Sequence, residues 1–455
     1  MILYYDAETH KKIALDGSSR APHRVVPGEL SKKNYLQGHI SSTVPSTPAV
    51  LAYALEHHGT MSLSDVLLPA IAIAEQGFRI SQLQHDLARR ELKKLRERSA
   101  ALLFLYKGQR PYNVGALFRQ PVLAGTLRRL ADAGVEDFYL GDIARIIHKD
   151  MVQNDGLIRD DDLAQIPWPI ERKPLSVRFR EMRVITFGPP GAGRTLIEAL
   201  NIINEIPEKL LNIDTPQGAM LLAEIIRQAN MDRSDRPFEP NLYPQLPTKQ
   251  MLSTDYARVV ARRLRKRIKS HGDTTHLSVI DRKGNMVALT QSIERVYGSC
   301  EASPELGFLY NNYMSAFDYE DISHPYYMRP NAVPWASVAP TLVFKGRWPW
   351  LAIGSPGSER IVSAIIQVLL RLQSKSPYEA VVAPRLHCSL EGKVSLEASR
   401  MRNDIPTALT KKGFEVDIRD PYSFYLGCVQ LAMKGKKGEI IGVADPRRDG
   451  AAGGL

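Results

Sequence analysis

The chain has 455 residues, of which 44% are hydrophobic and 24% are charged, and its formal net charge is +11. This composition is typical of a globular protein with a substantial buried core, and it excludes a fibrous repeat or a fully disordered chain. No apolar run approaches the roughly 20 residues that a membrane span needs, so we expect no membrane span.

The first half of the sequence predicts helices with short strands between them. The opening residues, MILYYDAETHKK, lack the features of a signal peptide and predict a strand, and they leave the cellular location unknown. A helix is expected from Ser46-Thr47-Pro48 to Gly59, and a second over residues 62–76 with Gly77 as its C-cap. Further helices are expected over residues 82–98, 121–133, 141–153 and 195–205, with a strand over 183–187.

Part of the positive charge lies in residues 258–269, RVVARRLRKRIK. A nucleic-acid site would need interleaved aromatic residues or a recognisable module, and neither is present. We therefore interpret this run as the solvated end of a helix and expect no nucleic-acid partner.

The pattern after residue 274 changes to β-strands. Residues 277–281 and 286–290 predict one hairpin, and residues 341–344 and 350–353 predict another. A helix over 359–372 and strands near 414–419, 428–433 and 439–444 follow. Paired strands with helices in blocks predict an α+β fold, with helices layered on antiparallel sheets, of which a four-layer αββα sandwich is one solution.

The three cysteines, Cys300, Cys388 and Cys428, are far apart and fit no metal-binding spacing. We therefore expect no disulfide framework, no metal and no cofactor. His276 and His387 are interpreted as structural residues.

Residues 188–195, from Gly188 to Thr195, nearly match the phosphate-binding loop GxxxxGK[ST] between a strand and a helix. Arg194 occupies the lysine position, and its guanidinium is bulkier than the compact ammonium that fits inside such a loop. A P-loop nucleotide-binding protein is therefore a distant alternative, and a Gly/Pro turn leading into a helix is favoured.

A second motif extends from Gly272 through Asp273, Thr274 and Thr275 into the strand that ends near Asp281. A threonine hydroxyl is a weak nucleophile unless a base lies beside it. If the bond before Thr274 is broken, the new α-amine can be that base, because its reference pKa of about 7.7–8.0 is close to neutral. The motif alone is equally compatible with an ordinary pair of threonines entering a strand.

The block from Asp273 to Asp281 with Gly284-Asn285 resembles the segment where gamma-glutamyltranspeptidase precursors cleave themselves. Other blocks resemble the same family in the same order over nearly the whole chain. They are Gly59-Thr-Met-Ser-Leu63, Glu136-Asp-Phe-Tyr139 with Gly141, Gly156-Leu-Ile158, Asp162-Leu163, Gly188 to Gly193, Leu309-Tyr-Asn-Asn312, Ala339-Pro-Thr341, Gly354-Ser-Pro-Gly357 with Arg360-Ile361, Ala383-Pro-Arg385 and Asp445-Pro-Arg447.

This resemblance implies the αββα sandwich of N-terminal-nucleophile (Ntn) hydrolases, here without part of the family's N-terminal segment. Residues 1–273 would be a large subunit and residues 274–455 a small one, the two forming a single domain. Thr274 would cut the Asp273–Thr274 bond of a zymogen and then act as the nucleophile. The two fragments would stay associated.

The resemblance also implies the reaction and its residues. The enzyme would cleave a gamma-glutamyl amide such as glutathione, or a related acyl amide, through an acyl-enzyme that passes to water or an acceptor amine. The backbone N–H groups of Gly357 and Ser358 would form the oxyanion hole, although the family has glycine at the second position. Ser292 replaces a threonine that hydrogen-bonds the nucleophile.

The positions that would bind the glutamyl group depart from the family pattern. Its α-amino group would face Glu294, Tyr313 and Ala316, of which only Glu294 is charged. Its α-carboxylate would lie near Ser337 and Arg20, because Ser18 and Ala336 occupy the positions of the family's arginine and first serine. A changed acyl specificity, as in the acylases of the family, and an inactive paralogue are the alternatives. Members of the family are usually periplasmic, secreted or on the cell surface.

Overall fold

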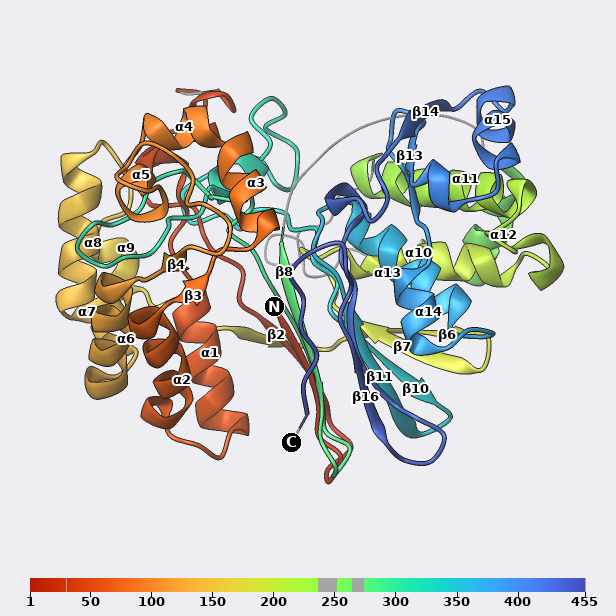
Figure 1. Cartoon of the computed structure of the whole chain (residues 1–455), viewed down its shortest axis with the longest axis horizontal. Helices are drawn as coiled ribbons and strands as arrows, with labels where there is room; N and C mark the ends of the chain where they lie inside the picture. The colour runs from red at the N-terminus through yellow and green to blue at the C-terminus, as the bar shows by residue number, and fades with distance from the viewer. Residues whose placement is uncertain (30, 236–251, 264–273, 455) are drawn as a thin grey trace. The chain divides into compact units, whose positions relative to one another are not determined.

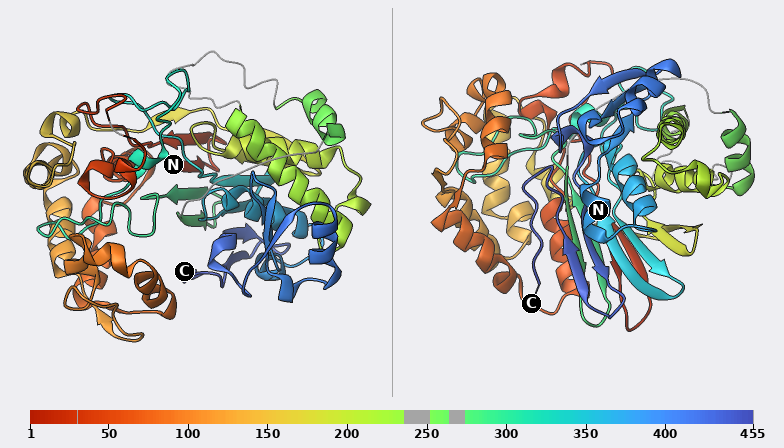
Figure 2. Two further views of the ribbon diagram at one scale, coloured as in Figure 1. Left: turned by 90° about the horizontal axis from the view of Figure 1, so that it is seen from above. Right: turned by 45° about the vertical axis from the view of Figure 1, so that its right-hand side comes forward.

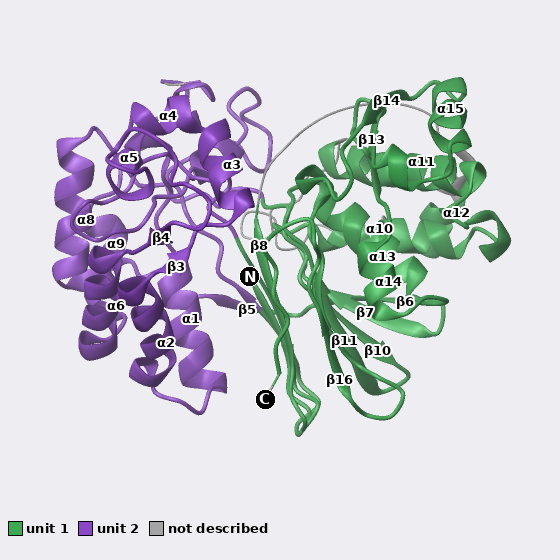
Figure 3. Cartoon of the chain, viewed as in Figure 1, with its two compact units in different colours: residues 1–14, 171–291, 336–455 green, residues 15–170, 292–335 purple. Residues whose placement is uncertain are grey.

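The computed structural model describes residues 1–29, 31–235, 252–263 and 274–454, and it divides into two compact units (Figure 3). Unit 1 comprises residues 1–14, 171–291 and 336–455, and unit 2 comprises residues 15–170 and 292–335. No helix among the described residues is long and apolar enough to cross a membrane.

Unit 1 contains two stacked sheets, seen edge-on in Figure 1. The first has the strand order β5-β2-β1-β9-β8, and the second has the order β16-β15-β11-β10-β7-β6. Apolar side chains from both sheets, among them Leu3, Tyr5, Ile280, Leu342 and Phe344, pack between them. The strands are β1 Ile2–Tyr5, β2 Lys12–Asp16, β5 Ile170–Arg172, β6 Leu175–Phe179, β7 Met182–Thr186, β8 Thr275–Ile280, β9 Met286–Gln291, β10 Thr341–Lys345, β11 Trp348–Gly354, β15 Gln430–Lys434 and β16 Ile440–Val443.

Each of these sheets combines strands from before residue 274 with strands from after it. Strand β1 pairs with β9, with Ile2 opposite Leu289, and β7 pairs with β10, with Thr186 opposite Thr341. Both pairings are antiparallel, and they join segments more than a hundred residues apart in the sequence.

A helical layer covers the outer face of the second sheet (Figure 2). It contains much of the largest core cluster, and almost every residue of α10 and α13 is buried. A small sheet with the order β12-β13-β14 lies beside it. The elements are α10 Gly193–Asn204, α11 Pro216–Asp235, α12 Thr254–Arg263, α13 Arg360–Arg371, α14 Pro377–Val382, α15 Asp404–Lys411, β12 Leu386–Cys388, β13 Lys393–Leu396 and β14 Glu415–Ile418.

Unit 2 is mainly helical, and its largest core cluster includes Phe138, Tyr139, Ile143, Ile147 and Tyr310. Its elements are α1 Thr47–His58, α2 Leu63–Gln76, β3 Phe78–Arg79, α3 Gln82–Arg90, α4 Leu92–Arg96, α5 Ala100–Phe104, β4 Leu117–Phe118, α6 Pro121–Ala133, α7 Glu136–Leu140, α8 Asp142–Gln153 and α9 Asp160–Ala164. Short 3-10 helices occur in both units. They are η1 Asn34–Leu36, η2 His39–Ser41 and η4 Tyr313–Ala316 in unit 2, and η3 Glu208–Leu210, η5 Ala398–Arg400 and η6 Phe424–Leu426 in unit 1.

The predicted elements agree with these bounds except at residues 82–98. The sequence predicts one helix there, but α3 ends before Glu91, whose ψ of 5° is not helical, and α4 follows. The expected basic helix end corresponds to α12 as far as Arg263, and residues 264–269 lie outside the described part of the chain.

Candidate active site

The turn between β8 and β9 sets the position of Thr274. One carboxylate oxygen of Asp281 accepts hydrogen bonds from the backbone N–H groups of Gly284 and Asn285, both at 2.8 Å. Gly284 has a φ of +96°, a conformation that side chains other than glycine rarely adopt. This turn fixes the register in which Thr275 lies opposite Gln291, the residue before Ser292.

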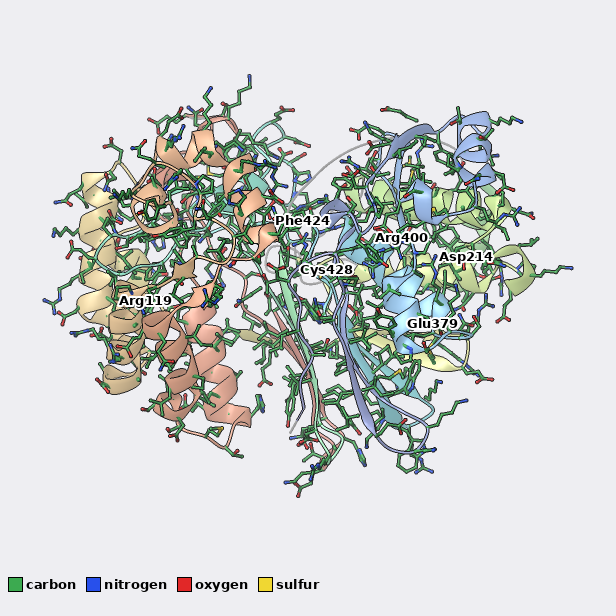
Figure 4. The ribbon with its side chains drawn as sticks, in the orientation of Figure 1. Arg119, Asp214, Glu379, Arg400, Phe424 and Cys428 are labelled. Carbon is green, nitrogen blue, oxygen red and sulfur yellow. The ribbon has the colours of Figure 1, made fainter. Side chains whose placement is uncertain are left out.

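Thr274 lies at the head of β8, where it lines a cavity of about 1630 Å³ in unit 1. The residue is half-buried, whereas Thr275 is exposed. The same cavity is lined by Pro356, Cys428 and the C-terminal residues 448–454. Cys428 is labelled in Figure 4. The sequence prediction required Thr274 to reach a cleft near the 357–358 turn, and this cavity contains both Thr274 and the proline that precedes that turn.

His276 holds the first part of β8 against the second sheet. Its ring packs on Gly354, where any Cβ would stand 2.2 Å from the ring carbon Cε1. Its Nδ1 lies 2.7 Å from Thr290 Oγ1, and its Nε2 lies 2.9 Å from Ser278 Oγ. Because the Ser278 hydroxyl donates its own proton to the Gln430 carbonyl (3.1 Å), Nε2–H must donate to Ser278, and Nδ1 accepts from Thr290. The ring is therefore a neutral structural group, as its sequence context suggested.

Burial lowers the pKa of His276 from 6.5 to about 3. Between about pH 3 and pH 6.5 the folded protein therefore keeps the His276 ring neutral, while in the unfolded chain the same ring takes up a proton below pH 6.5. We expect the free energy of unfolding to decrease as the pH falls through this window, by at most about 1.4 kcal/mol per pH unit from this residue. Urea denaturation at several pH values should therefore show a smaller pH dependence for His276→Gln than for the wild type. Parallel curves for the two proteins would contradict the assignment.

The turn after β11 presents two consecutive N–H groups. Gly357 has a φ of +129° and Ser358 a φ of +54°. Within the part of the chain that the structure describes, neither backbone N–H donates to a protein acceptor. A hydrogen bond next to this turn stabilises it, because the Ser355 hydroxyl accepts from the N–H of Cys428 at 2.9 Å. Two adjacent, unengaged N–H groups are what an oxyanion hole requires.

The backbone conformation at residue 358, where the resembling family has glycine, is one that serine can adopt. A φ of +54° lies in the left-handed helical region, which costs an L-residue roughly 1–2 kcal/mol but is sterically allowed. At Gly357, by contrast, a Cβ would stand 3.0 Å from the Cα of Gly427, and its φ is rare for any side chain.

Three predicted site residues lie together in unit 2, namely Ser292, Glu294 and Tyr313. Glu294 has a φ of +72°, and its N–H donates to Ser292 Oγ at 2.9 Å. Burial, together with the charge of Glu294, raises the pKa of Tyr313, which keeps this phenol protonated. The N–H of Arg295 donates to Asn312 Oδ1 at 3.1 Å, and this contact holds the two segments together.

The other predicted residues are in separate places. Arg20, in unit 2, forms a backbone bridge with Val44, and its Nη1 lies 3.5 Å from the Asn331 carbonyl. Ser337, in unit 1, is half-buried. Asp273, the residue before the expected cleavage point, lies outside the described residues.

The turn that resembles a phosphate-binding loop has a structural role. The N–H of Gly191 donates to the Gly188 carbonyl (3.0 Å), and the N–H of Ala192 donates to the Val338 carbonyl (2.9 Å). A Cβ at Gly193 would stand 1.9 Å from the Phe187 carbonyl oxygen, so the glycine permits close packing. These N–H groups are therefore used within the protein, and the turn positions the segment that contains Ser337.

Comparison with known proteins assigns the family. The family model described as gamma-glutamyltranspeptidase matches residues 1–455. The chain belongs to the gamma-glutamyltranspeptidase family.

Two curated relatives illustrate its range. A protein named glutathione hydrolase proenzyme from Escherichia coli (strain K12) is 30% identical over 448 residues, covering 92% of this chain and 76% of the relative. A protein named Acylase ACY 1 proenzyme from Pseudomonas sp. (strain V22) is 29% identical over 479 residues, covering 98% of this chain and 84% of the relative.

The solved structure of a cephalosporin acylase from Bacillus halodurans aligns with a TM-score of 0.88 at 26% identity, covering 99% of this chain and 85% of that one. The predicted α+β fold of Ntn-hydrolase type is therefore confirmed. The comparisons also confirm the prediction of a gamma-glutamyltransferase-like enzyme, an amide hydrolase and acyltransferase of this family.

A buried ionic network, which no pattern in the sequence predicts, lies beside the cavity. Arg447 donates from Nε and Nη2 to Glu397 (2.8 and 2.7 Å) and from Nη1 to Asp445 (3.1 Å). Arg385 pairs with Asp445 at 2.6 Å, and Arg400 pairs with Glu397 at 2.8 Å. Burial raises the pKa of Asp445, but the two arginines beside it outweigh this effect, so its pKa is lowered.

Asp445 of this network accepts a hydrogen bond at 2.8 Å from the N–H of Val429, which lies between the cavity-lining residues Cys428 and Gln430. In the sequence, the blocks around Arg385 and Asp445 stand out only by their resemblance to the family. Nothing local in the sequence indicated that they meet in space. Among the described residues, no group of three or more His, Cys, Asp or Glu side chains is arranged to hold a metal ion.

Proposed function

We propose that the chain cleaves itself before Thr274 and then hydrolyses, or transfers the acyl group of, gamma-glutamyl or closely related acyl amides. The observation that carries this proposal is the position of Thr274, at the head of β8 in a cavity that is also lined by Pro356, the residue before the 357–358 turn. Residues 1–273 and 274–455 would then be the two subunits of one sandwich.

In the proposed reaction, Thr274 Oγ1 attacks the amide carbonyl while the α-amine accepts the hydroxyl proton. The N–H groups of Gly357 and Ser358 stabilise the negatively charged oxygen of the tetrahedral intermediate. The α-amine then returns the proton to the leaving amine, and the C–N bond breaks to give an ester of Thr274. Water or an acceptor amine attacks this ester by the same steps. Ser292, next to the partner of Thr275 in the ladder, supplies a hydroxyl to the nucleophile.

Glu294, Tyr313, Ser337 and Arg20 are proposed to bind the acyl group. Glu294 supplies a carboxylate for an α-ammonium, which favours gamma-glutamyl substrates. Tyr313 supplies a neutral phenol and Ala316 only a methyl group. These two positions therefore also fit an acyl group that lacks some of the charges of a gamma-glutamyl group. The resemblance to acylases supports this second possibility.

Two measurements on the purified full chain test the proposal. Intact mass spectrometry should show two fragments, with the second beginning at Thr274. Turnover of a gamma-glutamyl anilide should then be compared with that of the glutaryl anilide, which lacks only the α-amino group. Glu294→Gln should reduce turnover of the first substrate more than that of the second. A single uncut chain without turnover of either compound would instead indicate a non-catalytic member of the family.

The oxyanion-hole assignment predicts a difference between two adjacent alanine substitutions. In Gly357→Ala the new Cβ meets Gly427 and disfavours the φ of +129°, so its N–H must turn. We expect kcat to fall about 10²–10³-fold, the loss typical of removing one oxyanion donor. Ser358→Ala keeps the backbone conformation and should remain within a few-fold of the wild type. Steady-state kinetics decide the matter, and equal losses in the two variants would contradict the assignment.

A further inference from the structure

Arg448 connects the nucleophile residue to a loop distant in sequence. Its Nη1 donates to the backbone carbonyl of Thr274 (3.2 Å), and its Nη2 donates to the carbonyl of Phe424 (3.5 Å). Its guanidinium carbon stands 3.8 Å from the centroid of the Phe424 ring. A planar guanidinium placed on an aromatic ring presents its donors in fixed directions, which a flexible ammonium does not.

The supports of Arg448 are themselves rigid. The preceding residue, Arg447, is fully buried and bound to Glu397 and Asp445. Glu397 Oε1, which accepts from Arg447 Nε, also accepts the N–H of Ser423 at 2.9 Å, next to Phe424. One buried carboxylate therefore anchors both the backbone before Arg448 and the loop on which its guanidinium rests. Phe424 is labelled in Figure 4 near Cys428.

We propose that Arg448 is a positioning residue that orients Thr274 for self-cleavage and for catalysis. The inference rests on the proposed function. A hydrogen bond to the carbonyl of residue 274 limits rotation about ψ of that residue. Rotation there would swing the α-amine and the hydroxyl as one group relative to the 357–358 turn. Arg448 accepts no proton and forms no bond to the substrate, so it acts only through the geometry of Thr274.

The test compares Arg448→Ala and Arg448→Lys with Arg400→Ala. Arg400 is a matched control, because its guanidinium lies 3.7 Å from the Tyr422 ring of the same loop and donates to a carbonyl, that of Val382, at 2.7 Å. It contacts Glu397 and not Thr274. Its loss should lower the thermal unfolding midpoint without changing kcat.

For Arg448→Ala we expect kcat and the rate of self-cleavage to fall together by about 10²-fold, the cost of a small misplacement of a reacting group. KM should stay within about threefold, since binding groups are not removed. Arg448→Lys should recover part of kcat. Millimolar guanidinium should restore part of the activity of Arg448→Ala, because the emptied position adjoins the cavity, and it should not stimulate the wild type or Arg400→Ala.

Three results would overturn the positioning role: an unchanged kcat in Arg448→Ala, a loss confined to KM, or an equal loss of kcat in Arg400→Ala. A loss without rescue by guanidinium or lysine, accompanied by a lower unfolding midpoint, would show a purely structural role and overturn it as well. A wild-type chain that neither cuts itself nor turns over substrate would overturn the proposed function, and with it any reaction for Arg448 to assist. An active wild type with unaltered Arg448 variants overturns only the positioning role.

Discussion

The substitution Thr274→Ala is expected to abolish both self-cleavage and turnover. Alanine keeps the backbone and the Cβ but removes the only atom that can attack a carbonyl. Loss of the nucleophile in enzymes with comparable acyl chemistry lowers kcat by about 10⁶-fold, and the remaining rate comes from binding and the oxyanion hole. Gel electrophoresis should show one band at the full length of the chain, and the anilide assay should show no turnover.

The neighbouring threonine provides the control. Thr275 has the same side chain but is exposed and lies on the opposite face of β8, so Thr275→Ala should cleave and turn over normally. Thr274→Ser keeps the hydroxyl and should retain reduced activity, since serine lacks the methyl group that restricts χ1. Cleavage of Thr274→Ala at the same bond would show that another group carries out the reaction.

The second large effect concerns stability. Arg447→Met removes the central cation of the buried network but keeps a side chain that fills similar space. It leaves Glu397 and Asp445 buried with fewer cationic partners, and removing one member of such a network typically costs about 3–5 kcal/mol. The free energy of unfolding from urea denaturation should decrease by this amount, and poor soluble yield would have the same origin.

Arg402 and Asp404 form the matching exposed pair, with donor and acceptor 2.6 Å apart and more than half of each side chain accessible. Arg402→Met should change the free energy of unfolding by less than about 1 kcal/mol, because solvent screens such pairs. If the two methionine variants were equally stable, the buried network would not be a determinant of stability.

Local signals in the sequence account for much of the secondary structure. Ser62 caps α2 by accepting the N–H of Asp65, and Gly77 ends it with a φ of +84°. Both roles follow from the side-chain chemistry of one or two residues, so a single sequence reveals them. The separation of α3 from α4 could not be predicted, because Glu91 is a residue that ordinarily favours a helix.

The candidate site shows the same limit at longer range. The Thr274 motif and the turn of Gly357 and Ser358 are contiguous in sequence and were recognised by resemblance. Arg448 lies 174 residues from Thr274, and only the packing of the final segment against β8 brings them together. No periodicity or spacing in one sequence encodes such a contact.

Both sheets contain strands from before and from after residue 274, and this has a consequence for refolding after cleavage. With β1 beside β9 and β7 beside β10, a cut before Thr274 would leave the pieces interlocked by ladder hydrogen bonds and a shared core. Refolding of the intact chain is a first-order process, whereas recovery of the cut protein from denaturant would be second order and depend on concentration. Maturation would thus be a one-way event, after which the enzyme keeps its shape only as long as it is never fully unfolded.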